Sequence, residues 1–242
     1  MKSPDLSQFK GIVAVVAAAG CGSRMSGDTP KQYLKINRQT ILDITLSRLV
    51  SFAPIELVVL VISPQDNYFK HLEYGENEKV IIIEGGAERA NSVHNALRFL
   101  YDSGLPDEAP VMVHDAARPC ITHQDLKQLS DTYQNTNQAC ILTSEVNDTL
   151  QKVGDSNLIE QTLDRSSLVR AYTPQMASFN QLKTSLKHAI DNKLNVTDEA
   201  SALLASNYAV ASVNGRADNI KITRNDDLAL AEFYLSKQES EK

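Results

Sequence analysis

A short glycine-containing segment near the start of the chain is well suited to bind a phosphate. Gly20, Cys21 and Gly22 come shortly after the apolar run Ile12–Val16. Small residues at such a turn let backbone N–H groups approach an anion without obstruction by side chains. Arg24 and Lys31 place two cations within reach of the same turn. The segment predicts a polyphosphate site, and a plain strand-to-helix turn with two solvated cations is the alternative interpretation.

Two familiar phosphate motifs are excluded by residue identity. The dinucleotide fingerprint Gly-x-Gly-x-x-Gly requires a glycine where Met25 stands. The P-loop spacing fits Gly22 and Gly27, but Asp28-Thr29 follow where Lys-Ser/Thr is required. The segment therefore supports neither hydride transfer nor P-loop hydrolysis.

A second candidate position is the carboxylate of Asp115, which ends the apolar run Val111–Val113 together with His114. Open α/β sheets bind ligands at the carboxyl ends of their strands, where a carboxylate can face a metal ion or a ribose. A His-Asp pair would also suit a catalytic triad, but no Ser or Cys stands in a nucleophile elbow. A metal-side or ribose-side role is therefore favoured.

The elements that must position these residues alternate between strand and helix patterns. Continuous apolar runs predict buried strands over Ile12–Val16, Leu57–Ile62, Val80–Ile83, Val111–Val113 and Ala139–Leu142. Apolar residues at helical spacing lie between them, over Ile41–Phe52 and Ala90–Leu100. This order predicts an α/β fold with a mainly parallel sheet flanked by helices on both faces.

The pattern changes between Glu145 and Gln175. Alternating segments on either side of Gly154–Asn157 predict a β-hairpin inserted at about residues 146–168. A hairpin cannot bury both of its faces alone, so we expect it to pack on a partner subunit. Without a linker or an internal repeat, residues 1–242 are predicted to form one domain.

The chain after the hairpin returns to helical patterns over Leu182–Ile190 and Asp198–Ser206, followed by a short strand over Val210–Val213. Thr223–Asp226 is typical of a capping box, and it predicts a last helix that runs through Tyr234. The charged tail from Lys237 to Lys242 is expected to fray.

Composition narrows the class of partner and the compartment. The 242 residues include 24 Lys+Arg, 30 Asp+Glu and three cysteines, for a net charge of −6. The acidic balance disfavours nucleic acid, and the few cysteines fit a reducing cytoplasm. Asp5 lies where a signal peptide is basic, and no stretch reaches the roughly 18–20 apolar residues of a membrane span. We expect a cytoplasmic protein, and local cations must attract any polyanionic ligand.

Six sequence blocks, in register over residues 12–234, resemble the family of 2-C-methyl-D-erythritol 4-phosphate cytidylyltransferases of the non-mevalonate isoprenoid pathway. They are Gly20–Leu34, Gly85–Val93, His114–Pro119, Thr173–Gln175, Thr197–Ser201 and Gly215–Thr223. The resemblance implies a Rossmann-like fold of the nucleotide-diphospho-sugar transferase type. It also implies transfer of CMP from CTP to the 4-phosphate of methylerythritol phosphate, with release of pyrophosphate and with Mg²⁺ as cofactor.

The resemblance assigns roles to individual residues. Cations would stabilise the transferring phosphorus and position the substrate phosphate; these catalytic positions are Arg24, Lys31, Arg165 and Lys221. CTP would be bound by Ala18, Ala19, Gly20, Cys21, Gly22, Gly86, Ala87, Ser92 and Asp115. Some members of the family carry Asp where Ala87 stands, which affects base specificity only if that side chain contacts the base.

The polyol phosphate would be bound by Asp115, Arg118, Thr149, Arg165, Thr173 and Thr197, and the metal by Asp115 and Asp218. Thr149 and Arg165 lie in the hairpin, which resembles the dimerisation arm of this family. The resemblance therefore implies a homodimer whose site is shared between two subunits. Without it, Arg165 would be interpreted as a solvated charge and Thr197-Asp198 as a helix N-cap.

Three alternatives are weighed against this function. A ribitol 5-phosphate cytidylyltransferase shares the fold and the CTP chemistry, but Ala117, Thr197–Ser201 and Arg216–Lys221 favour methylerythritol phosphate. A non-catalytic nucleotide sensor would lack Arg24, Lys31 or Lys221, and all three are present. A bifunctional enzyme with a fused cyclodiphosphate synthase would be expected to need a longer chain.

Overall fold

A computed structural model describes residues 4–20 and 29–241, and within these ranges seven strands form one main sheet. Their order is β11-β7-β10-β6-β1-β4-β5. The strands are β1 (Ile12–Ala17), β4 (Ile55–Ile62), β5 (Val80–Glu84), β6 (Pro110–Asp115), β7 (Ala139–Glu145), β10 (Val169–Ser178) and β11 (Val210–Asn214). β10 pairs antiparallel with β6 and β7, and the remaining neighbours pair in parallel. The predicted mainly parallel sheet is confirmed.

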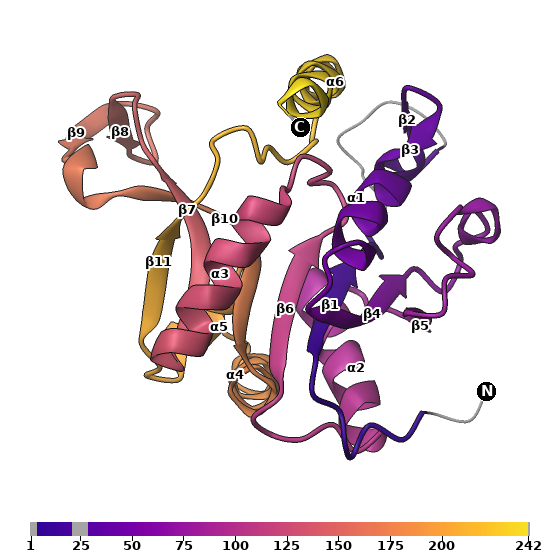
Figure 1. The fold of residues 1–242 in the computed structure, drawn as a ribbon. Helices are drawn as coiled ribbons and strands as arrows, with labels where there is room; N and C mark the ends of the chain where they lie inside the picture. The colour runs from indigo at the N-terminus through magenta and orange to yellow at the C-terminus, as the bar shows by residue number, and fades with distance from the viewer. Residues whose placement is uncertain (1–3, 21–28, 242) are drawn as a thin grey trace.

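Helices cover both faces of this sheet (Figure 1). One face carries α1 (Ile41–Val50) and α3 (His123–Thr136), and the other carries α2 (Arg89–Asp102), α4 (Phe179–Asp191) and α5 (Glu199–Ala205). Side chains alternate between the faces of a strand, so Ala14 and Val16 pack with the first group while Val13 and Val15 pack with the second. Burial on both faces is the reason that β1 is a continuous apolar run.

The last helix, α6 (Asn225–Ser240), differs from its prediction at both ends. At its start, the carboxylate of Asp227 rather than Asp226 accepts hydrogen bonds from the backbone N–H groups of Thr223 and Arg224. At its end, the helix continues from Lys237 to Ser240, so the expected fraying is wrong for these residues. Gln238 is buried and donates to the carbonyl of Cys120 at 2.9 Å, which holds the last turn against the loop after β6.

Strand β10 is missing from the prediction because Pro174 lies within it. A proline has no N–H to donate, so a proline in a short apolar run argues against a central strand. In the structure, the β10–β7 pairing has a register irregularity between Ala171 and Gln175, and Pro174 falls within that interval. The remaining residues of β10 still insert between β6 and β7.

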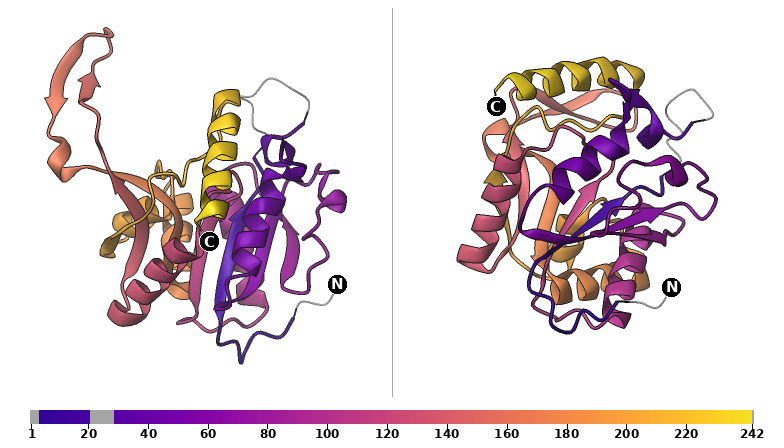
Figure 2. Two further views of the ribbon diagram at one scale, coloured as in Figure 1. Left: turned by 45° about the horizontal axis from the view of Figure 1, so that its top comes forward. Right: turned by 45° about the vertical axis from the view of Figure 1, so that its right-hand side comes forward.

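The predicted hairpin is present as β8 (Leu150–Val153) and β9 (Ile159–Leu163), which pair antiparallel and project away from the body of the protein (Figure 2). Its apolar side chains are uncovered, since Leu158 is 68% and Ile159 67% exposed. A second small ribbon joins β2 (Lys35–Ile36) to β3 (Gln39–Thr40) just before α1. Within the described residues, no helix is both long and apolar enough to span a membrane.

Candidate active site

A cavity of about 350 Å³ lies at the carboxyl ends of β1, β5 and β6. The side chains and backbone around it come from regions far apart in the sequence. Its lining includes these residues predicted for the site: Ala18, Ala19, Gly20, Lys31, Gly86, Ala87, Ser92, Asp115 and Lys221. The fold therefore brings the predicted small-residue segments and two predicted cations to one place.

The loops after β1 and β5 approach each other closely enough to require small residues. A Cβ atom on Gly85 would lie 2.6 Å from the Cβ atom of Ala19. Between the β5 loop and the start of α2, a Cβ atom on Gly86 would lie 2.5 Å from that of Asn91. The Ser92 hydroxyl accepts from the Gly86 N–H at 3.1 Å and donates to the Glu88 carbonyl at 3.0 Å. These contacts fix the backbone at the edge of the cavity.

Lys31 reaches the cavity from a short 3-10 helix, Lys31–Tyr33. The next residue, Gln32, is buried and donates from Nε2 to the carbonyl of Ala18 at 2.8 Å, which ties this helix to the end of β1. Lys31 donates from Nζ to the carbonyl of Ile222 at 3.1 Å, and the N–H of Ile222 donates to the carbonyl of Ala117 at 2.9 Å. The segment that carries Lys221 is thus held against both Lys31 and the loop after β6.

Asp115 lies at the end of β6 and binds three cations. Its Oδ2 atom is 2.8 Å from Nζ of Lys221 and 3.8 Å from Nε of Arg118, and its Oδ1 atom is 2.9 Å from Nε of Arg89. Burial by itself raises the pKa of Asp115, but the three positive charges outweigh burial and hold that pKa well below its usual range. Asp115 is therefore a carboxylate anion that orders the cations around it.

A buried polar layer lies behind Asp115. The hydroxyl of Thr173 accepts from the backbone N–H of Asp115 at 3.1 Å and contacts Nδ1 of His114 at 3.0 Å. The other ring nitrogen, Nε2, donates to the carbonyl of Arg118 at 3.2 Å, since a carbonyl can only accept. Burial lowers the pKa of His114 to about 4, so the imidazole is neutral and Nδ1 accepts from Thr173. Thr173 is thus fixed next to the predicted substrate side.

Arg118 is also held in place behind the cavity. Its Nη1 atom donates to the carbonyl of Asn219 at 2.7 Å, and its guanidinium lies 5.0 Å from the ring centroid of Tyr172. The contact with Asn219 links Arg118 to the segment that carries Lys221. Arg118 and Thr173 thus adjoin Asp115 without lining the cavity.

Other predicted residues lie outside this cavity. Thr149 and Arg165 are exposed at the base of the hairpin, where Arg165 donates to the carbonyl of Asn147. Thr197 is exposed just before α5, and Asp218 forms an ion pair with Arg216 at 2.7 Å. Cys21, Gly22 and Arg24 lie outside the described residues. Within the described residues, one chain thus brings part of the predicted nucleotide side together and leaves the hairpin residues apart from it.

Comparison with known proteins places this arrangement in a family. Residues 12–237 match the sequence model of the IspD family, described as 2-C-methyl-D-erythritol 4-phosphate cytidylyltransferase. The chain belongs to the IspD family. The six sequence blocks that suggested this family all lie within the matched residues.

Individual relatives agree with the IspD family over nearly their full length. The chain is 44% identical over 231 residues to the 2-C-methyl-D-erythritol 4-phosphate cytidylyltransferase of Vibrio atlanticus, covering 96% of this chain and 98% of the relative. It is 45% identical to that of Shewanella frigidimarina, covering 95% and 98%. A crystal structure of the Francisella tularensis protein of the same name has a TM-score of 0.81 at 33% identity, covering 93% and 100%.

Three residues at the site had no predicted role. Gln32 carries the link from Lys31 to Ala18, and Arg89 and Glu199 form a bidentate ion pair beside Asp115. All three stand inside blocks that resemble the IspD family, which is the signal that could have drawn attention to them. No spacing rule connects residue 89 with residue 199, so the pair itself could not be found from the sequence.

Among the described residues, few oxygen donors of the cavity are suited to hold a metal ion. Mg²⁺ commonly takes one or two carboxylates together with substrate phosphates and waters. Asp115 lies on the cavity wall, but both of its oxygens contact cationic side chains, so it would bind a metal only by exchanging one of these contacts. Asp218 does not line the cavity and is held by Arg216. In the described part of the chain, no three His, Cys, Asp or Glu side chains gather into a metal-binding group. A magnesium ion here would therefore need the oxygens of the bound phosphates.

Proposed function

We propose that this protein transfers CMP from CTP to 2-C-methyl-D-erythritol 4-phosphate and releases pyrophosphate, a step in isoprenoid precursor biosynthesis. The observation that carries the proposal is the meeting of Lys31 and Lys221 in one cavity beside Asp115. The relatives described above, at 44–45% identity over nearly the whole chain, are named for this activity. The arrangement of cations and small residues is what such a reaction requires.

The reaction needs cations more than it needs a base. An oxygen of the 4-phosphate attacks the α-phosphorus of CTP, and the bond from that phosphorus to the bridging oxygen of pyrophosphate breaks. The attacking phosphate is already an anion, so no general base has to remove a proton. Lys31 and Lys221 line the cavity and would stabilise the negative charge that accumulates on the transferring group. Arg24 would have the same role, as its match to the family's sequence block implies.

The small-residue side of the cavity would hold the cytosine and the ribose. The loop Gly86–Ser92 is fixed by the Ser92 hydroxyl, so its backbone donors and acceptors have set directions. A pocket of fixed donors and acceptors rejects a base whose edge leaves them unpaired. Ala87 is exposed and carries only a methyl group, so the contribution of this position to base recognition would be made by its backbone.

The polyol phosphate would be bound where two copies of the chain meet. Arg118 and Thr173 adjoin Asp115 within one chain, whereas Thr149 and Arg165 lie on the exposed hairpin. The uncovered Leu158 and Ile159 give the hairpin an apolar surface to bury. A homodimer in which each hairpin completes the partner's site would supply both needs. Thr197 would approach the substrate from the segment before α5.

Magnesium is proposed as the metal, held mainly by the triphosphate, and of the two carboxylates predicted as its ligands Asp115 is the one that lines the cavity. When bound, the ion would neutralise phosphate charge and align the triphosphate. The cytoplasm is proposed as the compartment, since Cys120 and Cys140 are both unpaired and buried.

The test is a pyrophosphate-release assay with CTP, Mg²⁺ and either 2-C-methyl-D-erythritol 4-phosphate or ribitol 5-phosphate. We expect turnover with the methylerythritol substrate and little with ribitol 5-phosphate. Comparable or faster turnover of ribitol 5-phosphate would overturn the substrate assignment. Binding of CTP without release of pyrophosphate would instead identify a nucleotide sensor. Omitting Mg²⁺ and adding EDTA tests the metal in the same assay, with loss of turnover as the expected result.

A further inference from the structure

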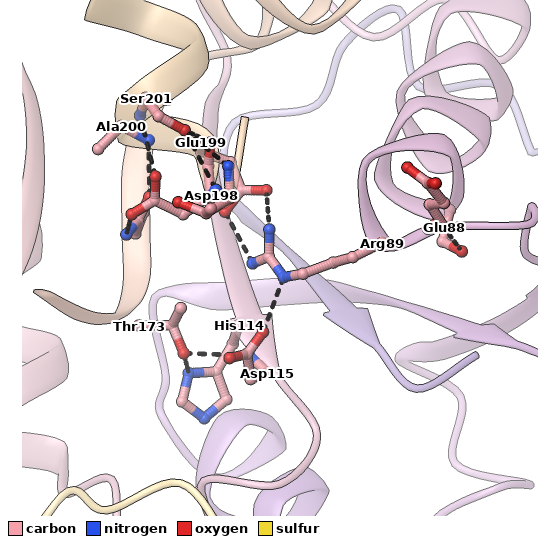
Figure 3. A network of polar contacts seen from close by, with 12 residues as sticks. Glu88, Arg89, His114, Asp115, Thr173, Asp198, Glu199, Ala200 and Ser201 are labelled. Carbon is pink, nitrogen blue, oxygen red and sulfur yellow. Dashed lines mark hydrogen bonds and ion pairs between the residues drawn. The ribbon is translucent and has the colours of Figure 1, made fainter. Parts of the chain in front are cut away.

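Arg89 connects two carboxylates that come from opposite sides of the site (Figure 3). It extends from the start of α2 and donates from Nη1 and Nη2 to the two oxygens of Glu199, at 2.7 and 2.9 Å. Its Nε atom donates to Oδ1 of Asp115 at 2.9 Å. One guanidinium thus uses three nitrogen atoms to fix the relative positions of α5 and the end of β6.

The side chains in this contact have little freedom. The side chain of Glu199 is 0% exposed, and that of Asp115 is 9% exposed. The side chain of Gln175 holds the segment around Glu199 with two hydrogen bonds. It accepts one from the N–H of Ala200 and donates one to the carboxylate of Asp198, both at 2.8 Å. Glu199 is therefore a rigid anchor for Arg89 rather than a mobile partner.

The position of Lys221 depends on which oxygen of Asp115 is free to bind it. Arg89 occupies Oδ1, and Lys221 binds Oδ2 at 2.8 Å. Without Arg89, the Asp115 carboxylate could rotate and Lys221 would lose a fixed counter-ion at the cavity wall. Lysine could not replace Arg89, because a single ammonium group lacks the planar fork that serves Glu199 and Asp115 together.

We propose that Arg89, anchored by Glu199, is a positioning residue that acts through Asp115 to hold Lys221 where the substrate phosphates bind. This inference rests on the proposed cytidylyl transfer. Arg89 fixes the orientation of the Asp115 carboxylate, and the carboxylate fixes the position of the Lys221 ammonium group. The charge of Arg89 also compensates Glu199, which would otherwise be a buried carboxylate without a counter-ion.

The first experiment separates positioning from simple stabilisation. Arg89→Gln leaves Glu199 buried and unpaired, so both the melting temperature and kcat should fall, kcat by about 100-fold. Arg89→Gln/Glu199→Gln removes the unpaired charge, and we expect it to recover most of the melting temperature while kcat stays low. Recovery of kcat together with the melting temperature would overturn the proposal. Arg98→Gln, an exposed arginine on the same helix, is the matched control and should change neither value.

Arg89→Lys tests the need for the planar fork. It keeps the charge but cannot serve both carboxylates, so kcat should remain far below that of the wild type. Wild-type kcat in Arg89→Lys would show that only the charge matters, and would contradict positioning through Asp115.

The second experiment asks whether Arg89 acts through Lys221. A double-mutant cycle combines Arg89→Gln with Lys221→Gln, and the residual rate is measured at high enzyme concentration. If Arg89 works by holding Lys221, its loss should change the rate of the Lys221→Gln protein less than threefold. If the rate of the double variant is instead reduced by the product of the two single reductions, the two residues act independently and the proposal is overturned. If the wild type itself transfers no cytidylyl group, the proposed function fails, and the same cycle is then read from the Kd for CTP by calorimetry.

Discussion

The cavity and the hairpin β8–β9 differ in how far their side chains are buried. The cavity lies at the ends of β1, β5 and β6. Around the cavity, Asp115 and Glu199 are nearly or fully buried and share Arg89. On the hairpin, the ion pair between Lys152 and Glu160 leaves both side chains at least half exposed, and Leu158 and Ile159 are uncovered. The buried contacts of the first region are all made within one chain, whereas the second presents surface that a single chain does not bury.

If the hairpin contributes to the site as proposed, this difference predicts how variants of the two regions will behave. The geometry of the cavity is set by packing and buried charge, so it should persist in any folded subunit. The hairpin carries Thr149 and Arg165 on a two-stranded ribbon, which is only marginally stable without further contacts. We therefore expect cavity variants to act within one subunit and hairpin variants to act between subunits.

The largest expected effect comes from Lys31→Ala in the cavity. Loss of one cation that stabilises the transferring phosphate should reduce kcat by about 100- to 1000-fold. The circular dichroism spectrum should be unchanged, because Gln32 still ties the 3-10 helix to Ala18. Near-wild-type turnover in this variant would remove Lys31 from the catalytic set.

A large pH effect on stability is expected from His114, which lies in the buried layer behind the cavity. Its pKa in the folded protein is lowered to about 4 from 6.5. Between these two pH values the unfolded chain binds a proton at this histidine and the folded chain does not. Stability is therefore retained above pH 6.5 and lost as the pH falls toward 4, by roughly 3 kcal/mol in total.

The measurement is urea unfolding from pH 7.5 to 4.5 for the wild type and His114→Gln. Below pH 6.5, the unfolding free energy of the variant should fall less steeply with pH than that of the wild type. His188→Gln, at an exposed position on α4, should keep the slope of the wild type. Equal slopes for the wild type and His114→Gln would show that this histidine is not held neutral by the fold.

A smaller effect on activity is expected from Arg165→Ala on the hairpin, a decrease of about 10- to 100-fold in kcat/KM for the polyol phosphate. The comparison is sharpened by mixing Arg165→Ala subunits with Lys31→Ala subunits. If each hairpin completes the partner's cavity, one intact site forms in every mixed dimer and activity rises above that of either variant. Absence of recovery, with subunit exchange demonstrated by native mass spectrometry, would contradict a shared site.

The smallest effect is expected from the exposed ion pair of the hairpin. Lys152→Ala or Glu160→Ala should change the unfolding free energy by less than about 1 kcal/mol, since solvent screens a pair of this exposure. Thermal unfolding at low and high salt provides the measurement. A change of several kcal/mol in either variant would mean that the hairpin is buried in the folded assembly.

The parts of the fold that followed from the sequence are those with a local signal. β1 and β4 are continuous apolar runs because both of their faces are covered, and the spacing of α2 matches one buried stripe. β10 gave no such signal, because Pro174 interrupts it and its pairing partners lie in distant segments. The end of α6 could not be predicted from the sequence either, since the contact that holds it joins Gln238 to the distant Cys120.

The candidate site divides in the same way. Residue types and family-like blocks pointed to Lys31, Asp115 and Lys221, and these do meet at one cavity. The pairing of Arg89 with Glu199 could not be predicted, because 110 positions separate the two residues. They meet because α2 and α5 both pack against α4.

The sequence by itself determined the class of chemistry, because six blocks of residue types in register carry the resemblance to the IspD family. It also determined most of the strands and helices, because their apolar periodicities are local properties, whereas β10 escaped it. Only the tertiary structure decided that Asp115 faces Arg89 and Lys221 with a different oxygen for each. Such contacts depend on how distant elements pack, and a buried charge takes its role from the partners that the fold places around it.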